Sequence, residues 1–100
     1  MTNWVIAYDV RDPRRLARVH RLLTNHACLL QFSVFLFSGS WDGVSRLLEE
    51  LGTLMDLRVD DLRCYEVMRS EGHVCLGRGM YPDGVYLGGV GGGLLLDGRC

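Results

Sequence analysis

Alternating hydrophobic and polar positions predict several short strands along this chain. The first apolar run, which Asp9 closes, predicts a buried strand over residues 3–9. Residues 28–37 alternate between two sets of side chains and are predicted to form one long strand. Further strands are predicted over residues 59–67, 73–76 and 85–87, with a turn at residues 82–84 before the last of them.

Two helices are predicted between these strands. Residues 13–25 place apolar side chains on one face and arginines on the opposite face, at spacings of three and four. Asp12 is expected to cap this helix, and a proline follows at its first position. A second helix is predicted from about residue 42 to residue 55, with Ser40 or Asp42 as its cap.

The order of these elements predicts a ferredoxin-like fold. The class is α/β, or more narrowly α+β, as a split βαβ sandwich with one extra C-terminal strand. Residues 1–87 are expected to form this single domain, and the glycine-rich residues 88–100 a mobile tail.

One face of such a sheet is left without helices. Two aromatic side chains, Phe35 and Phe37, are expected on this face, beside Gln31 and Ser33. An apolar face of this kind is stabilised by a partner, and the simplest partner is a second copy. The sequence therefore predicts a homodimer with two-fold symmetry.

Composition places the chain among soluble globular proteins. Hydrophobic residues make up 48% and charged residues 23%, and no apolar run approaches the ~20 residues of a membrane span. Because no basic segment precedes the first apolar run, no signal peptide is expected, and the chain is predicted to be cytoplasmic. The 4 cysteines and 3 histidines show no zinc-site spacing, so the cysteines are expected to be small buried residues.

Charge is distributed unevenly, although the formal net charge is only −1. Residues 11–21 carry five arginines and one acid, whereas residues 42–66 carry seven acids and three arginines. A nearly neutral total can therefore conceal a basic face and an acidic face. Two interpretations of the helix arginines stay open, a solvated surface and a set of phosphate contacts.

Asp9 is the candidate metal ligand, because it ends a buried strand directly before the arginine-rich helix. Mg²⁺ prefers oxygen ligands and is often held by one or two carboxylates together with phosphate. One aspartate per chain is few, but a two-fold dimer that joins both Asp9 side chains would supply two. The alternative is a carboxylate that only caps the following turn.

Three short segments together resemble a known family. Tyr8-Asp9 closes the first strand, Asp12 precedes several arginines, and Gln31-Phe32-Ser33-Val34-Phe35 lies in the predicted second strand. In this order and spacing they are similar to the small CRISPR-associated endoribonucleases, the Cas two family. The late segments at residues 63–65 and 76–85 are similar as well, so that the resemblance covers roughly residues 3–87.

The resemblance implies a ferredoxin-like homodimer whose last strand crosses to the partner's sheet. It implies a metal ion, Mg²⁺ or Mn²⁺, held by Asp9 of both chains. It further implies metal-dependent cleavage of single-stranded RNA, or of duplex DNA, and work with the Cas one integrase in spacer acquisition for antiviral defence.

Site residues follow by position. Tyr8 and Asp9 match the first motif, Arg18 matches a basic helix position, and Ser33 and Phe35 match the second-strand motif. In this hypothesis Asp9 holds the metal, and Tyr8, Ser33 and Phe35 complete the catalytic site. The nucleic-acid backbone is contacted by Arg11, Arg14, Arg15 and Arg18.

The chain departs from the family where some relatives carry basic residues, at Leu16, Leu29 and Leu30. These departures concern the nuclease activity more than the fold. Two alternatives therefore stay open: a non-catalytic dimeric adaptor that bridges integrase subunits, and a toxin-type ribonuclease of similar fold.

Overall fold

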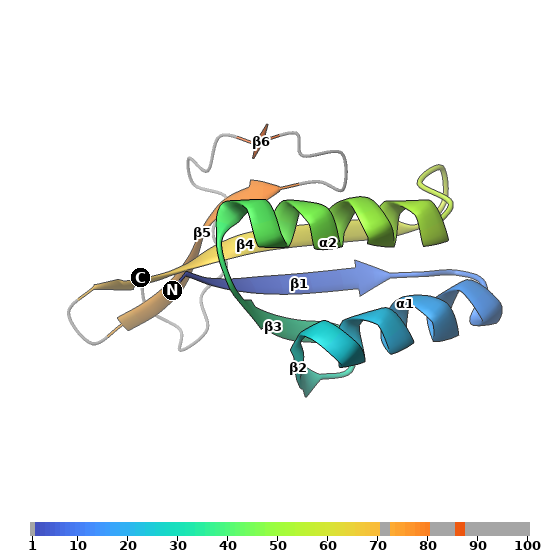
Figure 1. Cartoon of the computed structure of the whole chain (residues 1–100), viewed down its shortest axis with the longest axis horizontal. Coiled ribbons are helices and arrows are strands. Elements are labelled where there is room, and N and C mark those ends of the chain that lie inside the picture. The colour runs from blue at the N-terminus through green and yellow to red at the C-terminus, as the bar shows by residue number, and fades with distance from the viewer. Residues whose placement is uncertain (1, 71–72, 81–85, 88–100) are drawn as a thin grey trace.

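The computed structural model of the protein describes residues 2–70, 73–80 and 86–87, with side-chain surroundings over residues 2–68. Within these residues the chain forms an α+β fold (Figure 1). Its elements, in chain order, are β1 (Asn3–Asp9), α1 (Pro13–His26), β2 (Cys28–Gln31), β3 (Val34–Ser38), α2 (Trp41–Leu54), β4 (Asp61–Ser70), β5 (His73–Met80) and β6 (Tyr86–Leu87).

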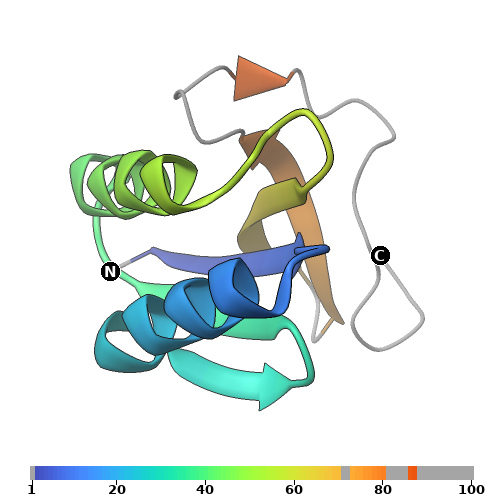
Figure 2. The same ribbon diagram turned by 90° about the vertical axis from the view of Figure 1, so that its right-hand side faces the viewer.

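All strands join one sheet in the order β2-β3-β1-β4-β5-β6, and every neighbouring pair is antiparallel. The central strand β1 lies between β3 and β4. Both helices lie on the same face of the sheet, as Figure 2 shows. This arrangement confirms the predicted ferredoxin-like fold, with further strand pairing beyond β4.

The helices begin where the sequence predicts, because their caps are encoded locally. The Asp12 carboxylate accepts hydrogen bonds from the backbone N–H groups of Arg14 and Arg15, each at 3.0 Å. Ser40, rather than Asp42, caps α2 by accepting a hydrogen bond from the Gly43 backbone. Side chains of this kind satisfy N–H groups that the first helical turn leaves unpaired.

The prediction of one long strand over residues 28–37 is wrong. The segment forms a hairpin of β2 and β3, with a turn at Phe32 and Ser33. Phe32 has a φ of 42°, in the left-handed region that glycine or asparagine usually occupies. The turn carries neither residue, and the alternation of side chains continues through it, so the sequence gives no sign of the reversal.

The predicted positions of Phe35 and Phe37 on the helix-free face are also wrong, because Phe37 lies opposite the buried Trp4 and packs against the core. Phe35 is opposite Ile6 in the β1–β3 register, and both side chains are fully buried beneath the helices. The register with β1 decides the face, because Phe35 and Phe37 lie opposite the core residues Ile6 and Trp4 and strand side chains alternate between faces. The helix-free face instead carries Val5, which lies opposite Leu36 on β3 and Tyr65 on β4.

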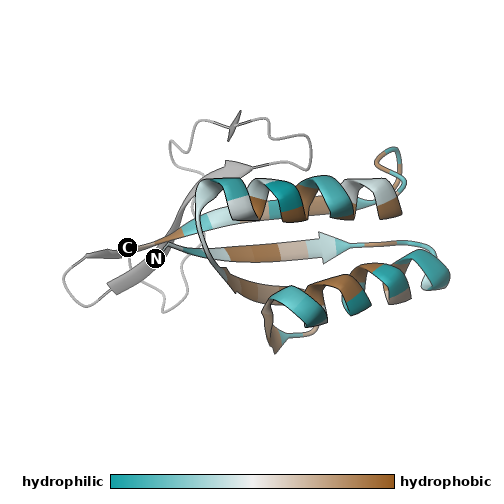
Figure 3. Ribbon diagram, in the orientation of Figure 1, coloured by the Kyte–Doolittle hydropathy of each residue, from teal (hydrophilic) through white to brown (hydrophobic). Residues whose placement is uncertain are grey.

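The core lies between the sheet and the two helices. Val19 and Leu23 of α1 contribute to it, and α2 contributes Val44, Leu47, Leu48 and Leu51. Figure 3 shows the hydrophobic colour along β1 and in bands around both helices. Burying each such leucine stabilises the fold by roughly 1.5–3 kcal/mol, so the two faces together fix the helices against the sheet.

The outer parts of the sheet bear on three further predictions. β6 pairs with β5 of the same chain, whereas pairing of residues 85–87 with a partner's sheet stays a prediction. The predicted turn at residues 82–84 and the tail at residues 88–100 lie outside the described residues. Among the described helices, none is long and apolar enough to cross a membrane.

Two cysteines have described side chains, and they differ. Cys64 is buried in the core, which raises the pKa of its thiol to about 12. Cys28 is exposed on the edge strand β2, so the expectation of buried cysteines is wrong for this residue.

Candidate functional site

The structure places Tyr8 and Asp9 on opposite faces of the sheet. Tyr8 points towards the helices and is 6% exposed. Asp9, the next residue, is exposed and lies on the helix-free face, opposite Asp61 in the β1–β4 register. The candidate site predicted from the sequence is therefore divided into two parts by β1.

The helix-side part brings Tyr8, Ser33 and Phe35 together. The Tyr8 backbone N–H donates to the Ser33 carbonyl at 3.1 Å, and the Tyr8 ring stacks on Phe35 with 6.1 Å between ring centroids. Burial raises the pKa of the Tyr8 hydroxyl, and a side-chain hydrogen bond to Ser33 offsets part of the rise. Because Phe35 is fully buried, it supports Tyr8 and does not itself reach a ligand.

His20 completes this group, although it is not among the site residues predicted from the sequence. Its Nδ1 atom lies 3.0 Å from the Tyr8 hydroxyl, and its ring meets the edge of Phe35 at 5.4 Å. The available signal was its position on the same face of α1 as Val19 and Leu23, which the helical pattern directs towards the sheet.

A groove opens beside this group, between α1 and the β2–β3 hairpin. It has a volume of about 770 Å³, which is within the usual range for ligand sites. Its lining includes Tyr8, His20, Arg21, Asn25, Phe32 and Ser33. Pro13, Leu16 and Ala17 form an apolar part of the wall, so polar, aromatic and aliphatic side chains meet in one concave surface.

The other part of the candidate site contains Asp9. Its neighbour Asp61 is also exposed, but Asp61 is held by an ion pair with Arg63 at 2.9 Å. Exposed carboxylate oxygens suit a hard divalent cation such as Mg²⁺. Over the part of the chain with described side chains, no three His, Cys, Asp or Glu residues are grouped to hold a metal. Among the described residues, one chain therefore offers the exposed Asp9 carboxylate, beside the ion-paired Asp61, to a divalent cation.

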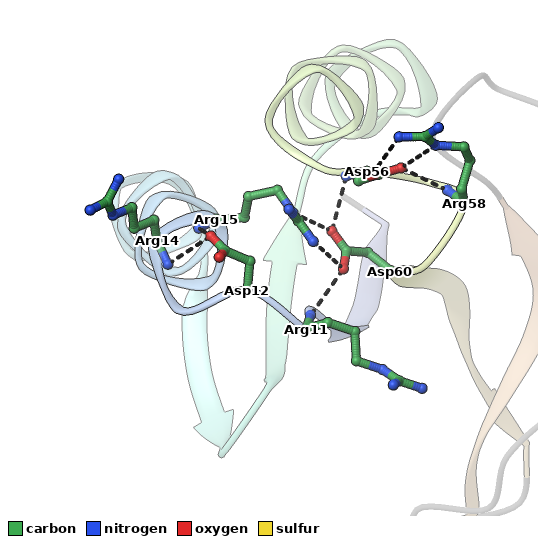
Figure 4. Close-up of polar contacts among 7 residues, drawn as sticks. All are labelled: Arg11, Asp12, Arg14, Arg15, Asp56, Arg58 and Asp60. Atoms are coloured by element: carbon green, nitrogen blue, oxygen red, sulfur yellow. Dashed lines mark hydrogen bonds and ion pairs between the residues drawn. The ribbon is translucent and has the colours of Figure 1, made fainter.

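The four arginines predicted to contact nucleic acid are not equivalent. Arg14 and Arg18 are exposed on α1, and Arg11 is exposed in the loop before it. Arg15 instead forms an ion pair with Asp60, with its Nε atom 2.9 Å from Oδ2. The side chain of Arg15 is consequently directed into the protein, as Figure 4 shows.

Asp60 is a second important residue that is not among those predicted from the sequence. Its side chain is fully buried and accepts hydrogen bonds from Arg15 and from the backbone N–H groups of Arg11 and Asp56 (Figure 4). The hydrogen bonds from Arg15 hold the pKa of this carboxyl well below its usual range, against the opposing effect of burial. The group ties the loop after Asp9 to the loop before β4.

Comparisons with known proteins give a consistent result. The family described as "CRISPR associated protein Cas2" matches residues 1–72. A CRISPR-associated endoribonuclease Cas2 of Nitrosomonas europaea is 38% identical over 90% of this chain and 86% of its own. A protein of the same description from Thermodesulfovibrio yellowstonii is 31% identical over 82% of this chain and 91% of its own.

A solved structure gives the same picture at the level of the fold. The crystal structure of a hypothetical protein, TT1823 from Thermus thermophilus, is similar with a TM-score of 0.63 and 26% identity. The similarity covers 73% of this chain and 93% of that one.

Proposed function

Because this chain belongs to the CRISPR-associated Cas2 family, we propose that it is an endoribonuclease that cleaves single-stranded RNA. The observation that carries the proposal is its identity of 38%, over nearly the whole chain, to a relative described as an endoribonuclease. Duplex DNA is the alternative substrate, since phosphate contacts alone do not separate the two.

We place the phosphodiester chemistry at Asp9. Its carboxylate is exposed at the end of β1, and the exposed Arg11, Arg14 and Arg18 follow within a few residues. In this proposal one Mg²⁺ or Mn²⁺ ion is held between two chains, by the Asp9 carboxylate of each. When bound, the ion supplies positive charge at the scissile phosphate and lowers the pKa of water.

The remaining residues bind and orient the substrate. Arg11, Arg14 and Arg18 are proposed to hold the backbone of the nucleic acid, because a guanidinium can contact phosphate through two hydrogen bonds. Arg15 is proposed to act indirectly, by fixing the loop through Asp60. Tyr8, Ser33 and the buried Phe35 shape the helix side of the same strand end.

We also propose a cellular setting. The chain would act in the cytoplasm as a homodimer that works with the Cas one integrase in spacer acquisition. An adaptor without catalysis is the second candidate. Its support is that, among the residues with described side chains, Asp9 is the one carboxylate at this strand end without an ion pair, beside the ion-paired Asp61.

The test is the substitution Asp9→Asn, which keeps the size of the side chain and removes the charge that a hard cation needs. We expect it to abolish Mg²⁺-dependent cleavage of a labelled single-stranded RNA, while binding of that RNA without metal is preserved. Asp42→Asn is the matched control, because Asp42 is an exposed aspartate in the first turn of α2. This control should cleave at the wild-type rate.

The pH dependence of the cleavage rate gives a second test in the same assay. The wild-type rate should rise with pH if a water molecule must lose a proton before attack. Cleavage by Asp9→Asn at the wild-type rate would refute the proposed site. Absence of cleavage in both proteins, with intact binding to the integrase, would instead favour the adaptor.

A further inference from the structure

We propose that the groove between α1 and the β2–β3 hairpin binds one unstacked base of a single-stranded nucleic acid. In this assignment Phe32 is the stacking surface, and Arg21 contacts the neighbouring phosphate. The proposal rests on the proposed nuclease function and adds a substrate contact on the face of the sheet opposite Asp9. The groove volume of about 770 Å³ is ample for a base and part of its sugar.

Phe32 is the strongest indication. The residue is 89% exposed, although a phenylalanine gains free energy when it is buried. Its φ of 42° is also unfavourable for any residue except glycine, asparagine or aspartate. An aromatic ring that is held at a hairpin tip against both preferences is well explained by a ligand that stacks on it.

Polar groups for the edge of a base lie in the same groove. His20 uses Nδ1 for Tyr8, and over residues 2–68 its other ring nitrogen has no hydrogen-bond partner. The side-chain amide of Asn25 is likewise free over these residues and can both donate and accept. Bases of single strands are recognised by this combination of an aromatic face and a few polar groups.

Charge favours a nucleic acid over a protein segment as the occupant. α1 carries no acidic residue and four arginines, of which three, Arg14, Arg18 and Arg21, make no ion pair with a described side chain. Arg21 lines the groove and makes no ion pair with any residue whose side chain is described. A phosphate next to the bound base would therefore meet an uncompensated guanidinium.

The test measures binding without cleavage, by fluorescence anisotropy of a single-stranded RNA oligonucleotide in EDTA. Phe32→Gly removes the ring and suits the positive φ, so that the turn is preserved. We expect it to weaken binding roughly 5- to 100-fold, the effect of losing one stacked base. Phe32→Trp keeps an aromatic ring and should bind the RNA as tightly as the wild type. Leu57→Ala should have no effect, because this exposed leucine lies in the loop before β4.

Arg21→Ala tests the phosphate contact separately. It should reduce the salt dependence of binding by a slope of about 0.7, the value for one neutralised phosphate of a single strand. A 2-aminopurine base in the oligonucleotide should change in fluorescence on binding to the wild type, and this change should be absent with Phe32→Gly.

Three outcomes would overturn the proposal. Unchanged RNA binding by both Phe32→Gly and Arg21→Ala would overturn it. The nuclease proposal would remain intact, because it is tested separately, by the cleavage assay of Asp9→Asn. Loss of integrase binding in Phe32→Gly, with RNA binding unchanged, would assign the groove to a protein partner. A wild-type protein that binds no RNA in EDTA would also refute the groove contact.

Weak RNA binding by Phe32→Gly together with full cleavage by Asp9→Asn would support the groove and refute only the metal site.

Discussion

At the scale of single residues, Asp60 is the most consequential interior group. Its buried carboxylate accepts hydrogen bonds from one arginine side chain and from two backbone N–H groups, and these come from three segments of the chain. Removing a buried acceptor leaves all of its donors unpaired, which costs more free energy than the original bonds contribute.

Asp60→Ala should therefore lower the free energy of unfolding by about 3–5 kcal/mol. Urea denaturation followed by circular dichroism measures this change. Asp61→Ala is the control, because Asp61 forms only an exposed ion pair with Arg63 and should cost about 0–1 kcal/mol. Equal effects of the two substitutions would contradict the role given to Asp60.

The same carboxyl predicts the acid stability of the protein. Its pKa in the folded state lies below the ordinary value of 3.8, so the unfolded chain binds the proton more readily. The stabilisation is complete above pH 3.8 and is lost as the pH falls through the folded-state value. Thermal unfolding between pH 7 and pH 2 should show this decline, and Asp60→Asn should flatten it.

At the scale of elements, α1 separates two kinds of arginine. The side chain of Arg15 is engaged by Asp60, whereas Arg14 and Arg18 are exposed on the helix surface. The contact with Asp60, in the loop before β4, makes this division. A sequence pattern of arginines alone does not distinguish the two kinds.

Replacing both Arg14 and Arg18 by alanine should weaken nucleic-acid binding and flatten its dependence on salt. The slope should fall by about 0.7–0.9 for each phosphate that the variant no longer neutralises. Titrations at several salt concentrations measure it, and Arg46→Ala on the exposed surface of α2 serves as control. Arg15→Ala should mainly reduce stability. An unchanged slope in the double variant would show that these side chains are only solvated.

The helices and strands also show which parts of the fold can be predicted from the sequence. The buried run of β1, the capped start of α1 and the stripe of α2 are local signals, and each was predicted close to its observed bounds. The hairpin turn at Phe32 was missed because an ordinary aromatic residue occupies a position that glycine usually fills. Asp60 and Asp61 look alike in sequence, and only the tertiary packing buries the first.

At the scale of the whole molecule, the helix-free face of the sheet predicts association. Leu36 and Tyr65 are partly exposed on this face, on either side of the buried Val5. Apolar side chains in such an array favour contact with a second copy. The candidate site residues also lie on different faces of the sheet. Tyr8 is on the helix side, and Asp9 is on the side where the two copies would meet.

We expect sedimentation to show a dimer at micromolar concentration. Leu36→Asp should give a folded monomer, because a charge at the dimer contact is not paired. A negative charge at the exposed Leu57, in Leu57→Asp, should leave the dimer intact. Deletion of residues 88–100 should also preserve it, whereas deletion of residues 82–100 should weaken it. A wild-type monomer under these conditions would contradict the prediction.

The opposed directions of Tyr8 and Asp9 have a consequence for substrate length. An RNA that lies in the groove beside Tyr8 reaches the Asp9 carboxylate only after it passes around the end of β1. The thickness of one sheet would then act as a molecular ruler that sets the spacing between the held base and the cut bond. Cleavage of a graded series of oligonucleotides should therefore show a minimum length, and the cut should lie at a fixed number of nucleotides from the held base.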